Sequence, residues 1–88
     1  MRKVTFYPEA LQELFDIASQ DKQAFKRIEK LLKDIQRNPF EGIGKPEALK
    51  HNFSGLWSRR IDDKNRLIYE VSDHSICIIS CKGHYTDK

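Results

Sequence analysis

Hydrophobic residues in the first half of the chain follow first the pattern of a strand and then that of a helix. Residues 3–7 (Lys-Val-Thr-Phe-Tyr) are rich in β-branched and aromatic side chains, which predicts a first strand. Pro8 follows, and proline suits the first turn of a helix. The apolar positions beyond it are three and four residues apart: Leu11, Leu14, Phe15 and Ala18. This spacing predicts a helix directly after the strand.

A second amphipathic helix is predicted immediately after the first. Asp21 is a residue type that caps helix N-termini. The apolar positions of the helix are Phe25, Ile28, Leu31, Leu32 and Ile35, and the basic positions opposite them are Lys26, Lys30, Lys33 and Arg37. Asn38 precedes a proline, which disfavours helical geometry, so the helix should end there. Two such helices in tandem form a hairpin that needs an apolar surface to cover.

The second half is predicted to contain a loop and three strands. Residues 39–53 hold two of the three prolines and two of the four glycines, which is typical of a loop with little regular structure. Loops of this length in compact domains are often functional. Strands are predicted at 56–62, 66–71 and 76–82, separated by short segments rich in turn formers. Such short turns make the three strands an antiparallel meander.

The predicted order β-α-α-β-β-β defines the fold class. We expect one α+β domain over residues 1–88, with a two-helix hairpin packed on one face of a small, mainly antiparallel sheet. Alternation places Leu67, Tyr69 and Val71 on one face of their strand, and this apolar face should meet the helices. Arg66 then lies on the open face, between the 39–53 loop and the C-terminus.

Composition narrows the classes of function only slightly. The net charge is +3 and acids interleave with bases, so a nucleic-acid partner is permitted but not established. Cys77 and Cys81 are four apart in a predicted strand, roughly 13 Å, which is too far for a disulfide. We therefore expect buried free thiols and a reducing cytoplasm. The three histidines are scattered, so no metal site or cofactor is expected, and no apolar run is long enough to span a membrane.

Three residues of the second half are of the types that RNA cleavage without a metal would require. That reaction needs a base for the 2′-hydroxyl, an acid for the 5′-oxygen and positive charge for the phosphate. Glu47, His84 and Arg66 are of the right types for these roles. Each also has an ordinary explanation, as a solvated loop glutamate, a frayed terminal histidine and a strand-edge arginine. The residue types alone leave both interpretations open.

Longer motifs favour the catalytic interpretation of these residues over the ordinary one. Residues 38–61 (NPFEGIGKPEALKHNFSGLWSRRI), the segment 65–69 (NRLIY) and the pair His84-Tyr85 resemble the YoeB/Txe family of bacterial toxins, within the RelE superfamily. The resemblance covers essentially the whole chain. It implies a cytoplasmic toxin of a type II toxin–antitoxin system. Such toxins are ribosome-dependent, metal-independent endoribonucleases that cut mRNA in the A site by 2′-hydroxyl attack and so inhibit translation.

The resemblance also implies partners. A cognate antitoxin of the YefM/Axe kind inhibits the toxin by wrapping its C-terminal segment over it. The pair typically represses its own operon, with the antitoxin supplying most of the contact with operator DNA. The free toxin is expected to be a dimer, and its substrate is mRNA held by the ribosome.

Carried over by position, the general base falls on Glu47, the phosphate-stabilising arginine on Arg66 and the general acid on His84. The terminal aromatic falls on Tyr85, which could stack on a base beside the cut. The chain departs from the usual pattern at Gly83, where the family often has an aromatic residue, and it has three further residues after Tyr85.

Three basic residues, Lys50, Arg59 and Arg60, are expected to attract RNA. Arg59 and Arg60 point to opposite faces of their strand, so at most one should approach the scissile phosphate, and Arg60 is favoured. Two alternatives come from other classes: a non-catalytic member of the fold that binds RNA, the ribosome or a protein, and a relative of the ParE toxins that poison gyrase. The complete set of base, arginine and acid speaks against both.

Overall fold

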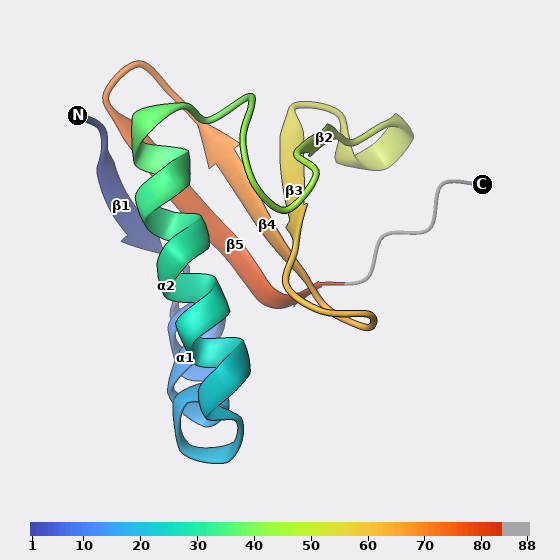
Figure 1. Cartoon of the computed structure of the whole chain (residues 1–88). Coiled ribbons are helices and arrows are strands. Elements are labelled where there is room, and N and C mark those ends of the chain that lie inside the picture. The colour runs from blue at the N-terminus through green and yellow to red at the C-terminus, as the bar shows by residue number, and fades with distance from the viewer. Residues whose placement is uncertain (84–88) are drawn as a thin grey trace.

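The computed structural model describes residues 1–83 and packs two helices on one face of a five-stranded sheet (Figure 1). Its elements are β1 (Lys3–Phe6), α1 (Pro8–Gln20), α2 (Lys22–Arg37), β2 (Glu47–Ala48), the 3₁₀ turn η1 (His51–Phe53), β3 (Leu56–Arg60), β4 (Arg66–Val71) and β5 (Ser75–Gly83). The predicted α+β class, with a helix hairpin on a mainly antiparallel sheet, is confirmed.

The sheet has the order β1-β5-β4-β3-β2. The last three strands form the predicted antiparallel meander, whereas β1 lies parallel to β5, with Val4 opposite Ile76. Parallel strands need a long crossover. Here β1 and β5 are joined through both helices and the rest of the sheet. The helix hairpin therefore covers one face and leaves the other open.

The predicted loop contains two short elements that the sequence did not predict. β2 is two residues long and pairs with β3, placing Glu47 opposite Ser58 and Ala48 opposite Trp57. Neither Glu nor Ala favours strands, so the pairing with β3 must fix this segment. A turn of 3₁₀ helix, His51–Phe53, then leads back into β3.

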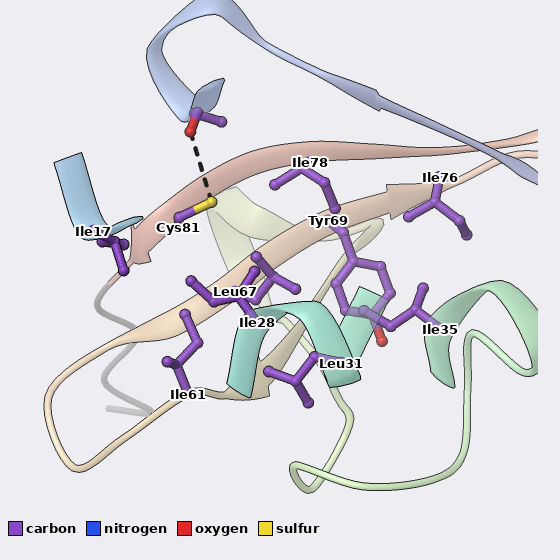
Figure 2. Packing of buried hydrophobic residues seen from close by; sticks show 11 residues of the cluster. Ile17, Ile28, Leu31, Ile35, Ile61, Leu67, Tyr69, Ile76, Ile78 and Cys81 are labelled. Carbon is purple, nitrogen blue, oxygen red and sulfur yellow. Dashed lines mark hydrogen bonds between the residues drawn. The ribbon is translucent and has the colours of Figure 1, made fainter. Parts of the chain in front are cut away.

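The core lies between the helices and the covered face of the sheet (Figure 2). Leu67 and Tyr69 are fully buried there, as predicted. In α2 the buried residues are Ile28, Leu31 and Ile35, all at predicted apolar positions. The helix also begins and ends as predicted, since the Asp21 side chain accepts a hydrogen bond from the Ala24 amide at 3.1 Å and Asn38 follows its last residue.

In α1 the buried face is only partly the predicted one, since Leu14 packs against the core as predicted. Ala10 and Ile17 are buried, while Leu11 and Phe15 are 37% and 58% exposed. The small Ala10 lets the helix approach β5 closely, and its carbonyl accepts a hydrogen bond from the Cys81 thiol at 3.6 Å (Figure 2). The face of α1 that meets the core therefore contains Ala10, Leu14 and Ile17, and Leu11 and Phe15 lie outside it.

Both cysteines are free thiols, as expected, although only Cys81 is fully buried and Cys77 is half-buried. Burial, with a smaller contribution from the charge of Glu13, raises the pKa of Cys81 to about 12. Among the described residues, no helix combines the length and the apolar character needed to cross a membrane.

Candidate active site

Arg59 lies in the interior instead of on the predicted RNA-binding surface. Its side chain is fully buried and forms an ion pair with Asp34 of α2. Its guanidinium also donates to the Tyr69 hydroxyl at 3.1 Å. The remaining bonds go to carbonyls of the loop after α2: Asn38 at 2.6 Å, Glu41 at 2.9 Å and Ile43 at 3.1 Å. With its donors occupied and no exposed surface, Arg59 is placed to hold this loop and not to meet a phosphate.

Two partners of Arg59, Asp34 and Tyr69, make further hydrogen bonds of their own. The hydrogen bond from Arg59 holds the pKa of the Asp34 carboxyl below its usual value, and the bond from the Ile43 amide at 3.0 Å lowers it further. The Tyr69 hydroxyl donates to the Pro39 carbonyl at 2.8 Å, and burial raises its pKa. The buried ends of the network are thus hydrogen-bonded, as buried polar groups must be to avoid a large desolvation cost.

Two glycines let the loop pass close to this network. Gly42 and Gly44 both have positive φ, at 130° and 80°. A Cβ on Gly42 would lie 1.9 Å from an Asp34 carboxylate oxygen, and one on Gly44 would lie 2.7 Å from a methyl of Leu31. Any other residue would therefore clash as well as strain the backbone. These are the two glycines of the motif that first marked the loop.

The loop that Arg59 contacts leads into β2 and places Glu47 on the open face of the sheet. The Gly44 carbonyl accepts a hydrogen bond from the Arg60 amide at 2.7 Å, and beyond β2 the Leu49 amide donates to the Leu56 carbonyl at 2.9 Å. Between these two bonds, Glu47 pairs with Ser58. Directly paired residues share a face, so both side chains lie on the side away from the helices.

Glu47, Ser58 and Arg66 form one cluster there, from three neighbouring strands. Nη1 of Arg66 lies 3.0 Å from the Ser58 hydroxyl and 3.4 Å from the Glu47 carboxylate. Ser58 is fully buried, whereas the Glu47 and Arg66 side chains are 39% and 26% exposed. The cluster thus presents a carboxylate and a guanidinium to solvent on a rigid base. Sequence reasoning missed Ser58, although strand alternation already placed it on the face of Arg60.

The other predicted residues lie around this cluster or beyond the described chain. Arg60 pairs with Arg66 across β3 and β4, and its partly exposed side chain contacts Asp63 at 2.9 Å. Lys50 is exposed, immediately before η1. His84 and Tyr85 lie outside the described residues, which end at Gly83.

The end of β5 is held by a residue that sequence reasoning did not single out. β1 stops at Phe6, so the far end of β5 has no strand on that side among residues 1–83. One carboxylate oxygen of Glu13 in α1 takes its place. It accepts hydrogen bonds from the amides of Cys81 at 2.7 Å and Lys82 at 3.3 Å. Gly83, just beyond, pairs with Arg66, so the described chain ends beside the cluster.

Chemically, the cluster offers a proton acceptor beside a fixed cation. Both described contacts of Arg66 use Nη1, so within residues 1–83 its Nε and Nη2 donate to no other group. Nε and Nη2 lie on one edge of the guanidinium and can together donate hydrogen bonds to two oxygens of one anion. A phosphate bound there would lie within reach of the Glu47 carboxylate.

Comparison with known proteins shows that the chain is similar to small bacterial toxins. Two solved structures of small bacterial toxins share the fold: the YoeB dimer from Staphylococcus aureus (TM-score 0.89, 48% identity, covering 96% of this chain and 98% of that chain) and the heterotetrameric YoeB–YefM toxin–antitoxin complex from the same organism (TM-score 0.87, 48% identity, covering 97% and 99%). The chain is also 57% identical over 65 residues to the toxin YoeB of Escherichia coli K12, covering 74% of this chain and 77% of that protein.

A family model, described as YoeB-like toxin of bacterial type II toxin–antitoxin systems, matches residues 6–85. The chain belongs to this family. The predicted family is thereby confirmed.

Proposed function

We propose that this toxin is an endoribonuclease that cuts mRNA in the ribosomal A site without a catalytic metal, and so stops translation. The observation that carries the proposal is the pairing of the Glu47 carboxylate with the Arg66 guanidinium, 3.4 Å apart and both partly exposed on the open face. A base and a phosphate-binding cation are two of the three groups that cleavage by 2′-hydroxyl attack requires.

In the proposed reaction, Glu47 takes the proton of the RNA 2′-hydroxyl as its oxygen attacks the adjacent phosphorus. Arg66 stabilises the negative charge that builds on the phosphate oxygens. The bond to the 5′-oxygen then breaks, and His84 gives that oxygen a proton. The products are a 2′,3′-cyclic phosphate and a free 5′-hydroxyl. Base and acid must lie on opposite sides of phosphorus for this in-line path.

The surrounding residues have proposed binding roles. Tyr85 stacks on a base beside the cut, and Lys50 and Arg60 attract the RNA backbone. Arg59 has no such role, because it is buried and paired with Asp34. Its contribution to activity is to hold the loop from which Glu47 emerges.

We propose an antitoxin of the YefM kind as the partner that inhibits this toxin, with operator DNA bound through that complex. The support is a solved complex of YoeB with YefM at 48% identity to this chain. A homodimer of the free toxin is proposed on the same ground, because a related structure is described as a YoeB dimer.

The test is primer-extension mapping of mRNA in a translating extract. Wild-type protein should produce cuts at ribosome-occupied codons, and Glu47→Gln and His84→Ala should each reduce cutting by about 100-fold or more. Glu41→Gln is the matched control, since it makes the same change in the same loop, where only the Glu41 carbonyl has a described bond. Blocked translation without cuts would replace the proposal with simple ribosome binding, and intact translation would direct attention to gyrase.

A further inference from the structure

The end of β5, next to the candidate active site, departs from a regular strand. Ile68 of β4 is opposite Ser80, and Arg66 is opposite Gly83. Between these two pairs β4 advances by two residues and β5 by three. β5 thus carries an extra residue here, which defines a β-bulge. Bulges bend a strand and change the direction in which it continues, and they are frequent beside active sites.

Glu13 of α1 holds this bulge through a single carboxylate oxygen. The oxygen, Oε1, accepts hydrogen bonds from the amides of Cys81 at 2.7 Å and Lys82 at 3.3 Å, and from the Ser80 hydroxyl at 3.1 Å. In a regular strand successive amides point to opposite edges, so the bulge is what lets two neighbouring amides meet one oxygen. Successive amides arranged in this way form a concavity that binds anions. The Glu13 carboxylate is therefore matched to the bulge.

A second contact from α1 reaches the same segment. The Ala10 carbonyl accepts a hydrogen bond from the buried Cys81 thiol at 3.6 Å (Figure 2). Ala10 is three residues before Glu13, so the two lie on one face of the helix. This face of α1 thus holds the bulge along the edge of β5 that lies beyond the end of β1.

The bulge determines where β5 ends relative to Arg66. A Cβ on Gly83 would lie 2.4 Å from Cγ1 of Ile68 and 3.1 Å from the Arg66 carbonyl oxygen, so the two strands approach closely here. The next residue along the chain is His84, the proposed general acid. A slip of one residue at the bulge would shift the start of that residue by about 3.3 Å and reverse its face. Catalysis tolerates much less, since a misplacement of about 1 Å can cost about 100-fold in rate.

We propose that Glu13 is a positioning residue for the general acid: by holding the bulge at Cys81 and Lys82, it fixes where the chain enters His84. The inference rests on the proposed function and adds to it a residue that touches neither the substrate nor the reacting atoms. The alternative is a carboxylate that only stabilises the fold. The two roles differ in their consequences, because a positioning residue affects proton donation to the 5′-oxygen and a stabilising one does not act on that step alone.

Amide hydrogen exchange of the full chain, followed by NMR, tests the contact itself. In Glu13→Ala the amides of Cys81 and Lys82 should exchange faster than in the wild type, while those of residues 76–78, beside β1, should not change. Glu13→Gln keeps a side-chain oxygen that can accept these bonds, so its exchange should be close to that of the wild type. Unchanged exchange at Cys81 in Glu13→Ala, or equal acceleration along all of β5, would overturn the proposal.

A leaving-group experiment separates positioning from stability. The substrate is ribosome-bound mRNA in which sulfur replaces the bridging 5′-oxygen at the cleaved linkage. Thiols are much more acidic than alcohols, so when the P–S bond breaks the sulfur leaves as a thiolate and needs no proton. On the ordinary linkage, Glu13→Ala at saturating concentration should cut about 10- to 100-fold more slowly per folded molecule. On the sulfur linkage, Glu13→Ala and His84→Ala should both cut at nearly the wild-type rate.

Three further variants serve as controls. Glu29→Ala also removes a glutamate from the middle of a helix, but Glu29 is exposed in α2, and this variant should cut both linkages like the wild type. Glu13→Gln should restore most of the activity on the ordinary linkage. Glu13→Leu removes the acceptor but keeps side-chain volume and helix propensity, so it replaces Glu13→Ala if the alanine variant has a lowered melting temperature.

The possible results are distinct. If the Glu13 variants that lack the acceptor are slowed equally on both linkages, Glu13 only stabilises the fold and the proposal is overturned. If they cut the ordinary linkage at the wild-type rate, the positioning role is wrong and the ribonuclease stands. If the wild-type protein cuts neither linkage, the proposed function itself fails, and the positioning role falls with it.

Discussion

Replacing the buried Arg59 by alanine should come close to unfolding this protein. The change removes hydrogen bonds to five acceptors: the Asp34 carboxylate, the Tyr69 hydroxyl and three loop carbonyls. At about 1 kcal/mol for each lost hydrogen bond the cost is about 5 kcal/mol. Removing one partner of a fully buried ion pair costs about 3–5 kcal/mol. Because the Asp34 side chain is 28% exposed, this range is an upper limit for the ion pair alone.

The total stability of a domain of this length is about 4–13 kcal/mol, so Arg59→Ala removes a large share of it. Arg59→Lys keeps the charge but loses the planar fork, and one ammonium cannot reach oxygens on Asp34, Asn38 and Glu41 together. We expect a loss of about 2–3 kcal/mol for that variant. Both losses are measured as free energies of unfolding in urea at neutral pH.

Arg60→Ala is the matched control, at the next position on the opposite face. Its described side-chain contact is with Asp63, which is 97% exposed. An exposed pair of this kind contributes about 0–1 kcal/mol. If Arg59→Ala and Arg60→Ala lose the same free energy, or if Arg59→Lys is as stable as wild type, then the buried network does not hold the loop and the structural role assigned to Arg59 is wrong.

Two further predictions concern the neighbours of this network and of the cluster. The pKa of Asp34 is lowered by folding, so its contribution to stability is present above the ordinary value of 3.8 and is lost as pH falls through the folded-state pKa. The difference in unfolding free energy between wild type and Asp34→Asn should therefore be largest at neutral pH and shrink in acid; a difference that does not change with pH would contradict this. Ser58→Ala removes a 3.0 Å contact to Arg66 at a stability cost of about 1 kcal/mol, and cleavage per folded molecule should fall severalfold, while the exposed Ser54→Ala should cut normally.

Local patterns predicted most of the architecture. The apolar spacing of α2, its Asp21 cap and its end at Asn38 are decided within a few residues of chain, and all three are as predicted. The faces of Leu67 and Tyr69 follow from strand alternation alone. β2 and the parallel position of β1 depend on partners far away in the sequence, so no local pattern could specify them.

Arg59 and Arg60 show where reasoning from sequence stops. The two are chemically identical neighbours, and alternation correctly separates their faces. Alternation cannot show that a charged side chain is tolerated on the inward face. Arginine is almost never fully buried unless it is paired, so its burial depends on a partner that alternation does not identify. That partner, Asp34, is 25 positions earlier in the chain and on a helix. The position of Arg59 within the family motif therefore predicts a contact with RNA, although its described bonds are all internal.

The position of Arg59 explains how a strand of only two residues can hold the Glu47 carboxylate in place. A two-residue strand such as β2 has little stability of its own, since even a complete two-stranded hairpin is marginal in water. Its approach is fixed instead by the bonds of Arg59 to Asn38, Glu41 and Ile43. Glu47 can remain partly exposed because the rigidity that orients it lies on the covered face of the sheet. The buried Arg59 thus holds the loop that positions Glu47, and the partly exposed Arg66 is the residue proposed to bind the phosphate on which Glu47 would act.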